Sequence, residues 1–499
     1  MCLATDLGMG FPFEHGLHAT LNTMRLCDVL DVDAEIASQA YYACLLMYSG
    51  CTVDGDQQSQ LFGGSVTEHN QHRQFGSQWE SLAGVIRAVP SPQASLPRRA
   101  YEIVTGLPRA ARFRDPHFIA LCEVAGMIAE RLGVPESIHG MFPLLTERWD
   151  GRSILKRARG DDIPLPLRII HVGRDATYQR LIGNDEHVVD VIRARAGHAF
   201  DPTVAGAFVD NAADVLGPPD PPESVWGDLL DAEPKPGLVL KGEDIDEALA
   251  AIGAFADLSS PYLSGHSSGV AELAEFAAVI HGFGRSDIDT IRRAAFVHDV
   301  GRVAVHPRIW AKPGKLGADE REQVRLHPYH TERVLARSPY LANLASIACA
   351  HHERIDGSGY HKAVSAAALP PTARLLAAAD AFHSKTEPRP YREKLSSEEA
   401  TAVLATKARQ GKLDSEMAGA VAEAAGQPAP TIERPAGLTH REVEVIALLA
   451  RGMQTKQIAR ALDISPKTAD RHIQNTYRKI GVSSRAAATL FASEQGLLT

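Results

Sequence analysis

The decisive stretch of this sequence spans residues 351–360 and reads His351-His352-Glu353-Arg354-Ile355-Asp356-Gly357-Ser358-Gly359-Tyr360. Two adjacent imidazoles are borderline-soft metal ligands. The glycines that alternate in the following turn allow backbone N–H groups to come close to a ligand. The stretch therefore predicts the rim of a metal-dependent phosphohydrolase site, and the alternative is a surface loop in which histidines are frequent by chance.

Further candidate ligands lie on both sides of this stretch, at the ends of apolar runs. His298 and Asp299 follow the run 294–297, and Asp380 follows the run 375–379. A carboxylate in such a place needs a partner or a metal ion, because an unpaired buried carboxylate is strongly disfavoured. The full set of candidate metal ligands is His266, His298, Asp299, His327, His351, His352 and Asp380.

Five imidazoles and two carboxylates exceed the ligand set of one tetrahedral zinc ion. They suit two divalent cations that share a bridging carboxylate, and Asp299 is our candidate for the bridge and for a catalytic role. Two such cations clamp the attacking and leaving oxygens of a phosphoryl displacement and lower the pKa of a bridging water. The mixed nitrogen and oxygen ligands fit iron, manganese or zinc without choosing among them. Arg302 and Arg389 are candidates for contacts with phosphate oxygens.

The motifs His298-Asp299-x-Gly301, His327-Pro328 and His351-His352-Glu353-x-x-Asp356-Gly357-x-Gly359-Tyr360 resemble the HD-GYP subgroup of the HD phosphohydrolases. The resemblance covers roughly residues 255–415. It implies an all-helical domain with a two-metal, sometimes three-metal, centre that opens cyclic dinucleotides, chiefly cyclic di-GMP. On this basis we assign catalysis to Asp299 and Arg302, and substrate binding to Arg302, Gly359, Tyr360 and Arg389.

Two positions depart from the HD-GYP pattern. His361 stands where a proline usually follows Gly-Tyr, and Arg302 replaces the usual lysine with a planar, forked cation. At an extra ligand position, four residues before His266, this sequence has Tyr262, which favours two ions over three. Two alternatives stay open: a transcription factor that senses a nucleotide and a metal without turnover, and an HD phosphohydrolase for another nucleotide.

The first part of the chain contains a degenerate copy of the same pattern. Residues 147–151 repeat residues 353–357 at an offset of 206, and residues 46–50 fall on 297–301 at an offset of 251. At the ligand positions the first copy has, in order, His15, Met47, Tyr48, Leu121, Leu145, Thr146 and Arg174. Such a set cannot hold a divalent ion, so we expect a metal-free duplicate with a sensory, docking or structural role.

These features divide the chain into four segments. We expect a metal-free HD-like domain at 1–215, a linker at 216–240 and a metal-dependent domain at 241–430, followed by a DNA-binding domain at 436–499. The linker is expected to be extended, because residues 217–236 include six prolines. Within the first domain, the Ser/Gln/Gly/Pro-rich segment 54–108 is expected to be an insertion and loop.

The bulk composition is that of an ordinary globular protein: 499 residues, 44% hydrophobic, with a net charge of −9. Six cysteines without a C-x-x-C pair indicate buried thiols in a reducing compartment. Without a signal peptide or an apolar run of about 20 residues, the sequence predicts a cytoplasmic protein that does not enter a membrane.

The last segment has the helix start and stop signals that are typical of a helix-turn-helix domain. Thr439 and Glu442 form a capping box, Ser465-Pro466 opens a long helix that ends at Gly481, and Ser484 caps a helix over 485–494. A glycine, Gly496, is expected to end that last helix. Residues 434–499 carry ten Lys/Arg and five Asp/Glu, a local positive charge suited to a phosphate backbone.

Residues 438–445 and 464–472 closely resemble the LuxR-type DNA-binding domain. The resemblance implies that double-stranded DNA and a second copy of the chain are partners, since these domains dimerise through their fourth helix. It assigns the recognition helix to Lys467, Thr468, Arg471 and His472, and phosphate contacts to Lys456 and Lys479.

Overall fold

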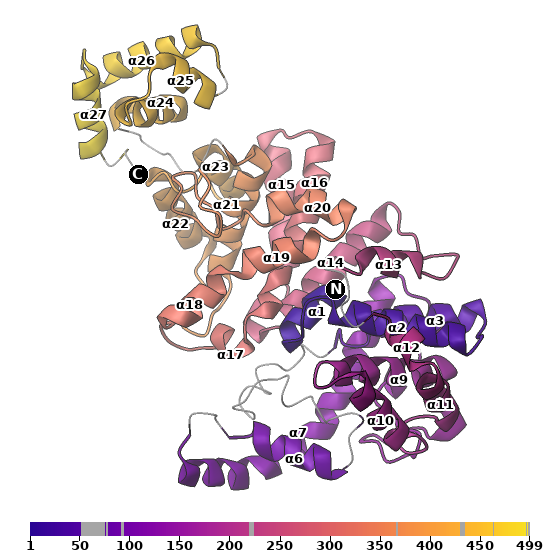
Figure 1. Ribbon diagram of the computed structural model, residues 1–499. Coiled ribbons are helices and arrows are strands. Elements are labelled where there is room, and N and C mark those ends of the chain that lie inside the picture. Colours follow the sequence, from indigo (N-terminus) through magenta and orange to yellow (C-terminus); the bar gives the residue numbers. More distant parts are fainter. Residues whose placement is uncertain are drawn as a thin grey trace. The chain divides into compact units, whose positions relative to one another are not determined.

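The structure, a computed structural model, describes residues 1–50, 75, 78–90, 94–218, 224–365, 368–429, 435–462, 464–495 and 497. Its described part consists of helices and their connections, without a β-strand (Figure 1). The all-α fold class is therefore confirmed. Among the described helices, none combines the length and the apolar character that a bilayer crossing requires.

The contacts divide the chain into two compact units. The first unit comprises Met1–Ser264 together with Val300–Lys312, and the second comprises Gly265–Asp299 together with Pro313–Thr499. The division thus falls at residue 264, later than the boundary at 241 expected from the sequence. It also assigns the segment directly after Asp299 to the first unit.

The helices of the first unit surround a core formed by α2, α3 and α9, which pack against one another. In chain order they are α1 (Cys2–Met9), α2 (His15–Val29), α3 (Ala34–Leu46), α6 (Gln78–Ala88), α7 (Leu96–Arg131), α8 (Glu136–His139), η1 (Phe142–Leu144), η2 (Gly160–Asp162), α9 (Leu165–Arg180), α10 (Asp185–Arg195), α11 (Pro202–Asp210), α12 (Ala212–Leu216), α13 (Trp226–Asp231), α14 (Glu243–Asp257), η3 (Pro261–Leu263), η4 (Val300–Ala304) and α17 (Pro307–Trp310).

Two predictions for this unit were wrong in part. The segment 54–108 is not a loop throughout, because it contains α6 and the start of α7. Pro97 is tolerated there because it occupies the first turn of α7, where no intrahelical N–H is needed. The expected linker is not extended throughout either, since α13 lies within it and Tyr41 Oη donates to the carbonyl of Leu229 at 3.0 Å. Residues 51–74 and 219–223 lie outside the described part.

The second unit begins with a bundle in which α15 packs against α16, α21 and α23. Alanines on the buried faces, including Ala274 and Ala278 of α15 and Ala378 of α21, allow the helices to come close together. The helices of this bundle are α15 (His266–His281), α16 (Arg285–Val297), α18 (Ala318–Arg325), α19 (His327–Leu335), α20 (Pro339–Ala348), α21 (Pro371–Thr386), α22 (Ser397–Arg409) and α23 (Ser415–Ala424).

The two units repeat the same local structure. Helices α9 and α21 begin and end at residues that are 206 positions apart, which is the offset found in the sequence. In each unit an arginine of this helix pairs with the aspartate that caps a later helix, α11 or α23. The pairs are Arg168 with Asp201 at 2.8 Å and Arg374 with Asp414 at 3.3 Å. The two units therefore share this helix and this ion pair at the same offset, and the tandem HD-like domains stay a prediction.

The start of the first core helix is also repeated. Helix α2 begins at His15 after Glu14, and α15 begins at His266 after Gly265. Both preceding residues have the left-handed conformation, with φ of 73° at Glu14 and 78° at Gly265. Glycine adopts this conformation without steric strain, whereas glutamate does not. The first unit therefore keeps the same turn although its residue there is less favourable.

Four helices at the C-terminus share a core of their own, centred on Val445, Ile446, Ile458 and Ile473. They are α24 (His440–Ala450), α25 (Thr455–Ala461), α26 (Pro466–Ile480) and α27 (Arg485–Glu494), and the turn η6 (Pro435–Gly437) precedes them. The predicted capping box and the caps at Ser465 and Ser484 are all present. Gly496 lies outside the described residues.

Candidate metal centre

All seven predicted ligands come together among five helices of the second unit. His266 and His327 are the first residues of α15 and α19, His298 and Asp299 follow α16, His351 and His352 follow α20, and Asp380 lies in α21. Six of the seven are at most 2% exposed, and the side chain of His352 is 16% exposed. Residues that are 114 positions apart in the chain thus line one buried site.

Asp299 lies between two sets of histidines. Its Oδ2 is 3.0 Å from His298 Nε2 and 3.3 Å from His266 Nε2. Its Oδ1 is 3.2 Å from His327 Nε2 and 3.3 Å from His351 Nε2. A carboxylate whose two oxygens face separate sets of imidazoles has the geometry of a bridging ligand.

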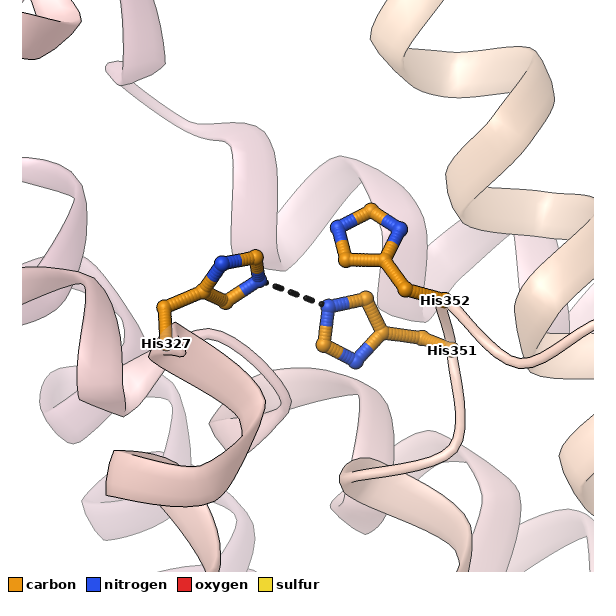
Figure 2. A group of neighbouring side chains, drawn as sticks. All are labelled: His327, His351 and His352. Carbon is orange, nitrogen blue, oxygen red and sulfur yellow. Dashed lines mark hydrogen bonds between the residues drawn. The ribbon is translucent and has the colours of Figure 1, made fainter. Parts of the chain in front are cut away.

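We call the residues His266, His298 and Asp380 the first half-site, and His327, His351 and His352 the second half-site; in each set the ligand atoms lie within 4.8 Å of one another. In the second half-site the three rings converge from α19 on one side and from the loop after α20 on the other (Figure 2). His327 Nε2 and His351 Nε2 are 3.1 Å apart.

Backbone carbonyls fix the orientation of three ligand histidines. Each Nδ1 lies near the carbonyl oxygen three residues earlier in the chain: His298 with Ala295 (2.6 Å), His327 with Val324 (2.5 Å) and His351 with Ala348 (2.7 Å). An Nδ1–H that donates to a carbonyl leaves the lone pair on Nε2, the atom that faces Asp299. The three rings are therefore held in the tautomer that binds a metal.

The ring of His266 is oriented by a side chain, Glu387, instead of a backbone carbonyl. Its Nδ1 lies 2.9 Å from Glu387 Oε2, and Arg389 Nη2 donates to the same oxygen at 2.7 Å. Burial alone would raise the pKa of Glu387, but hydrogen bonds from His266 and His383 hold it well below its usual value. The sequence reasoning missed Glu387, which directly follows the last residue of α21 and has an extended backbone, so that no helical spacing links it to Asp380.

The charge states at the centre suit a cation. Burial would raise the pKa of Asp380, yet the contact with His266 and the charges of His352 and His351 hold it well below the usual value. Burial, followed by the charge of His351, lowers the pKa of His352 well below its usual value. In addition, His298 Nε2 and His352 Nδ1 are buried without a hydrogen bond within the described part of the chain. A charged carboxylate and neutral imidazoles are the forms that ligate metals.

The turn after the His351-His352 pair is held by Glu353. Its carboxylate accepts from the backbone N–H groups of Lys362 at 2.8 Å and Val364 at 3.1 Å. At Gly359 a Cβ would come within 2.5 Å of the backbone of Glu353 and Arg354, so only glycine fits. Gly359 therefore has a steric role in the turn.

Tyr360 is engaged with a ligand. Its ring lies on the His352 ring with 4.7 Å between centroids, and Arg325 lies 5.1 Å from the Tyr360 ring centre. Next to it, His361 Nε2 is 3.2 Å from Glu332 Oε2. The tyrosine thus supports His352, and a direct contact of Tyr360 with substrate stays a prediction.

Arg302 lies in η4, which the contacts assign to the first unit. The Arg302 residue is 6% exposed, and its guanidinium carbon is 5.4 Å from the centre of the Trp310 ring. Trp310 Nε1 donates to the Arg302 carbonyl at 3.2 Å. The predicted catalytic and substrate-binding roles of Arg302 stay predictions.

At the position that corresponds to Asp380, the first unit has a positively charged side chain, Arg174. The Arg174 guanidinium carbon lies 3.7 Å from the centre of the Tyr48 ring, and His15 stacks on Phe11 at 4.4 Å. Burial and the charge of Arg174 lower the pKa of His15 to about 3. In the described residues of this unit, no three metal-binding side chains come together.

On the C-terminal domain, the predicted DNA-binding residues divide into two groups. Lys456, Lys467 and Arg471 are exposed, and Thr468 and His472 are partly exposed. Lys479 instead donates to Glu442 Oε2 at 2.6 Å and to the carbonyl of Gly437 at 2.9 Å. Glu442 is the capping-box residue of α24, so Lys479 has a structural partner inside the domain.

Two protein families match separate parts of the chain. Residues 252–417 match the HD domain family, and residues 436–492 match the family described as bacterial regulatory proteins, luxR family.

Several characterised proteins are similar to this chain. The 3'3'-cGAMP-specific phosphodiesterase 3 of Vibrio cholerae serotype O1 is 26% identical over 80% of this chain and 88% of its own length. The cyclic di-GMP phosphodiesterase response regulator RpfG of Xanthomonas campestris is 37% identical over 26% of this chain and 35% of its own length. The crystal structure of the cyclic GMP-AMP specific phosphodiesterase V-cGAP3 of V. cholerae aligns with a TM-score of 0.57 and 24% identity, over 85% of this chain and 96% of that one.

Proposed function

We propose that the centre of this chain binds two divalent cations and hydrolyses a cyclic dinucleotide such as cyclic di-GMP or 3'3'-cGAMP. The chain carries an HD phosphohydrolase domain and a LuxR-type domain, and it is homologous to HD-GYP cyclic dinucleotide phosphodiesterases. The protein is a metal-dependent phosphohydrolase, and the proposal concerns the number of ions, the substrate and the coupling to DNA.

The placement of Asp299 carries the proposal for two ions. Each of its oxygens lies within 3.3 Å of two imidazole nitrogens, and the two pairs come from different helices. Asp380 Oδ1 adds a second carboxylate to the first half-site, 3.5 Å from His266 Nε2. His352 adds a third imidazole to the second half-site. Iron, manganese and zinc all suit this donor set.

When bound, a pair of divalent cations supplies an activated water and neutralises charge on the phosphate oxygens. The residues of the chain provide its setting. His266, His298, His327 and His351 keep Nε2 unprotonated because Nδ1 donates elsewhere. Glu353 fixes the turn that presents His352, and Tyr360 packs on the His352 ring. The position of every ligand is thus set before a substrate enters.

The first copy acts as a metal-free duplicate in this proposal. The Arg174 guanidinium lies against Tyr48, so a positive charge of the chain stands where the second copy has Asp380. A second cation next to this guanidinium would be repelled. We assign this copy a sensory, docking or structural role.

The C-terminal domain binds double-stranded DNA in the proposal, and the chain acts as a homodimer. Lys467, Thr468, Arg471 and His472 lie on α26, which is the recognition helix of the LuxR-type arrangement. Lys456 on α25 contacts phosphate. The enzyme domain thereby couples a cyclic dinucleotide to transcription.

The test uses purified full-length protein. Its metal content is measured, and it is then given cyclic di-GMP, 3'3'-cGAMP and linear dinucleotide controls. The proposal is supported if the wild type hydrolyses a cyclic dinucleotide and if His298→Ala and Asp299→Ala lose both this activity and the bound metal. Both variants should still bind DNA. Unchanged hydrolysis in these variants refutes the site. Binding without turnover in the metal-loaded wild type favours a sensing transcription factor, and turnover of another nucleotide alone favours a different substrate.

A further inference from the structure

Two helices that supply ligands to the first half-site bring a second pair of residues together one turn further along. Gly269 of α15 lies three residues after His266, and His383 of α21 lies three residues after Asp380. Residues three apart share a helix face, and α15 packs against α21. Gly269 and His383 therefore lie next to the two ligands, in the same helix interface.

The ring of His383 occupies space that a residue with a side chain at position 269 would fill. A Cβ at Gly269 would lie 2.1 Å from His383 Nε2 and 2.5 Å from its Cε1. Glycine inside a helix is less favourable than alanine, so the glycine in α15 has a steric reason. The ring centres of His383 and His266 are 5.5 Å apart. The packing of α15 on α21 thus fixes where the His383 ring lies.

The other ring nitrogen of His383 lies near Glu387. His383 Nδ1 is 3.4 Å from Glu387 Oε1, and this buried nitrogen has no closer hydrogen-bond partner among the described residues. The second oxygen, Oε2, accepts from His266 Nδ1 at 2.9 Å and from Arg389 Nη2 at 2.7 Å. The Glu387 carboxylate is therefore placed between two imidazoles, one of which is a candidate metal ligand.

The orientation of Glu387 depends on these contacts. Glu387 follows the last residue of α21 and has an extended backbone, with φ of −103° and ψ of 148°, so the helix does not set the direction of its side chain. Arg389 and His266 share one oxygen, and a charged guanidinium is the stronger donor of the two. A contact on the other oxygen keeps the carboxylate from turning toward Arg389, and His383 supplies it.

The same residues also have the donor types of a metal site. The ligand atoms of His266, His383 and Glu387 lie within 4.8 Å of one another. Arg389 argues against an ion there, because its guanidinium already lies on the Glu387 carboxylate and a further cation would be repelled. In addition, His266 Nε2 lies 3.3 Å from Asp299 Oδ2, on the side of the two-ion centre. The contacts favour orientation of a ligand over binding of a third ion.

We propose that His383 is a positioning residue of the metal centre, which holds Glu387 against His266 and so sets the affinity of the first half-site for its ion. The second half-site should not depend on His383, because backbone carbonyls orient His327 and His351. The inference rests on the two-ion centre of the proposed function and does not depend on the identity of the substrate.

The experiment measures two metal affinities. Metal-free, full-length protein is titrated with Zn²⁺ against a competing chelator. His383→Leu should weaken the binding of one ion about 10-fold, the lower end of the effect of residues that orient a ligand, and should leave the other ion unchanged. Asp380→Asn identifies the first half-site, because it removes that ion. In the double variant Asp380→Asn/His383→Leu, the remaining ion should bind as it does in Asp380→Asn alone.

Three further variants separate positioning from folding. His383→Asn places an amide nitrogen close to the position of Nδ1 and should restore most of the affinity lost in His383→Leu. Gly269→Ala should weaken the same ion as His383→Leu, since its Cβ displaces the His383 ring. His281→Leu changes an exposed histidine at the other end of α15 and should leave both affinities unchanged.

Several outcomes overturn the inference. Unchanged affinities in His383→Leu, equal weakening of both ions, or an Asn variant that binds metal no better than the Leu variant each exclude a positioning role. Three ions per wild-type chain and two in His383→Leu would make His383 a ligand instead.

Failure of the proposed function is distinguishable from failure of this inference. A wild type that binds two ions but hydrolyses no cyclic dinucleotide refutes the function, and the titrations still decide the role of His383. A wild type that binds no metal overturns both.

Discussion

His266 donates the hydrogen of Nδ1 to Glu387 Oε2 across 2.9 Å, whereas the other oriented ligand histidines donate to backbone carbonyls. A side-chain substitution cannot remove a backbone carbonyl, but it can remove the carboxylate of Glu387. The first half-site therefore depends on a side chain that does not itself face Asp299.

We expect Glu387→Ala to weaken metal binding at the first half-site by about 10- to 100-fold, the usual effect of removing a group that orients a ligand histidine. The measurement is a titration of metal-free protein with Mn²⁺ or Zn²⁺, followed by metal analysis. Glu393→Ala, which changes an exposed carboxylate nearby, serves as the control. Equal metal affinity in the two variants would contradict the role of Glu387.

The two carboxylates of the centre should differ in their effect on metal stoichiometry. Asp299 contacts histidines of both half-sites, and Asp380 belongs to the first. We expect Asp299→Asn to lose both ions and Asp380→Asn to lose one, because asparagine keeps the shape but not the charge. Metal per chain, measured after gel filtration, distinguishes the two. Loss of the same number of ions in both variants would exclude a bridging Asp299.

The stability of the first unit should fall in acid. Burial and the charge of Arg174 lower the pKa of His171 to about 3, while the unfolded value is about 6.5. Below pH 6.5 the unfolded state therefore binds more protons, and stability is lost as the pH falls from 6.5 towards 3. At pH 5 this amounts to about 2 kcal/mol for this residue.

His171→Gln should reduce the difference in unfolding free energy between pH 7 and pH 5 by about that amount. All four tryptophans lie in the residue ranges of the first unit, so their fluorescence during urea denaturation reports on it. His198→Gln, an exposed control, should leave the pH dependence unchanged. A His171→Gln variant with the wild-type pH dependence would refute the assignment.

Arg471 and Lys479 should respond differently to substitution. Arg471→Ala removes an exposed charge of α26 and should weaken binding to a random-sequence DNA duplex, with a salt slope that is smaller by about 1. Lys479→Ala leaves the buried Glu442 without its ion pair and should lower the stability of the domain by about 1–3 kcal/mol. DNA titrations at several salt concentrations and thermal melting separate the two effects. A salt slope unchanged in Arg471→Ala would remove Arg471 from the interface.

Much of the fold could be predicted because its signals are local. Thr439, Ser465 and Ser484 are found as helix caps where the sequence places them. The offset of 206 between the copies also holds for whole helices, since α9 and α21 share it at both ends. Propensity misled at 54–108, because Pro97 and Pro108 suggest a loop, while one lies in the first turn of α7 and the other within it.

The site was predictable where a residue type alone implies chemistry. The histidines and aspartates of the centre are of this kind, and the structure brings all seven together. Glu387 is not, since a glutamate is an ordinary surface residue until folding places it beside His266. Its role depends on long-range packing between α15 and α21, which no local pattern encodes.

The left-handed residue before α2 has a further consequence. Glu14 keeps the strained turn that Gly265 adopts easily, and its carboxylate accepts from Ser224 Oγ at 3.0 Å and from Val225 N at 2.9 Å. In the second unit this turn precedes the candidate ligand His266. In the first unit the equivalent turn instead holds the segment at Ser224 and Val225 through the Glu14 carboxylate. Glu14→Gly would relax the backbone and remove both hydrogen bonds at once, so the residue that strains this turn is also the one that holds the segment at Ser224 and Val225.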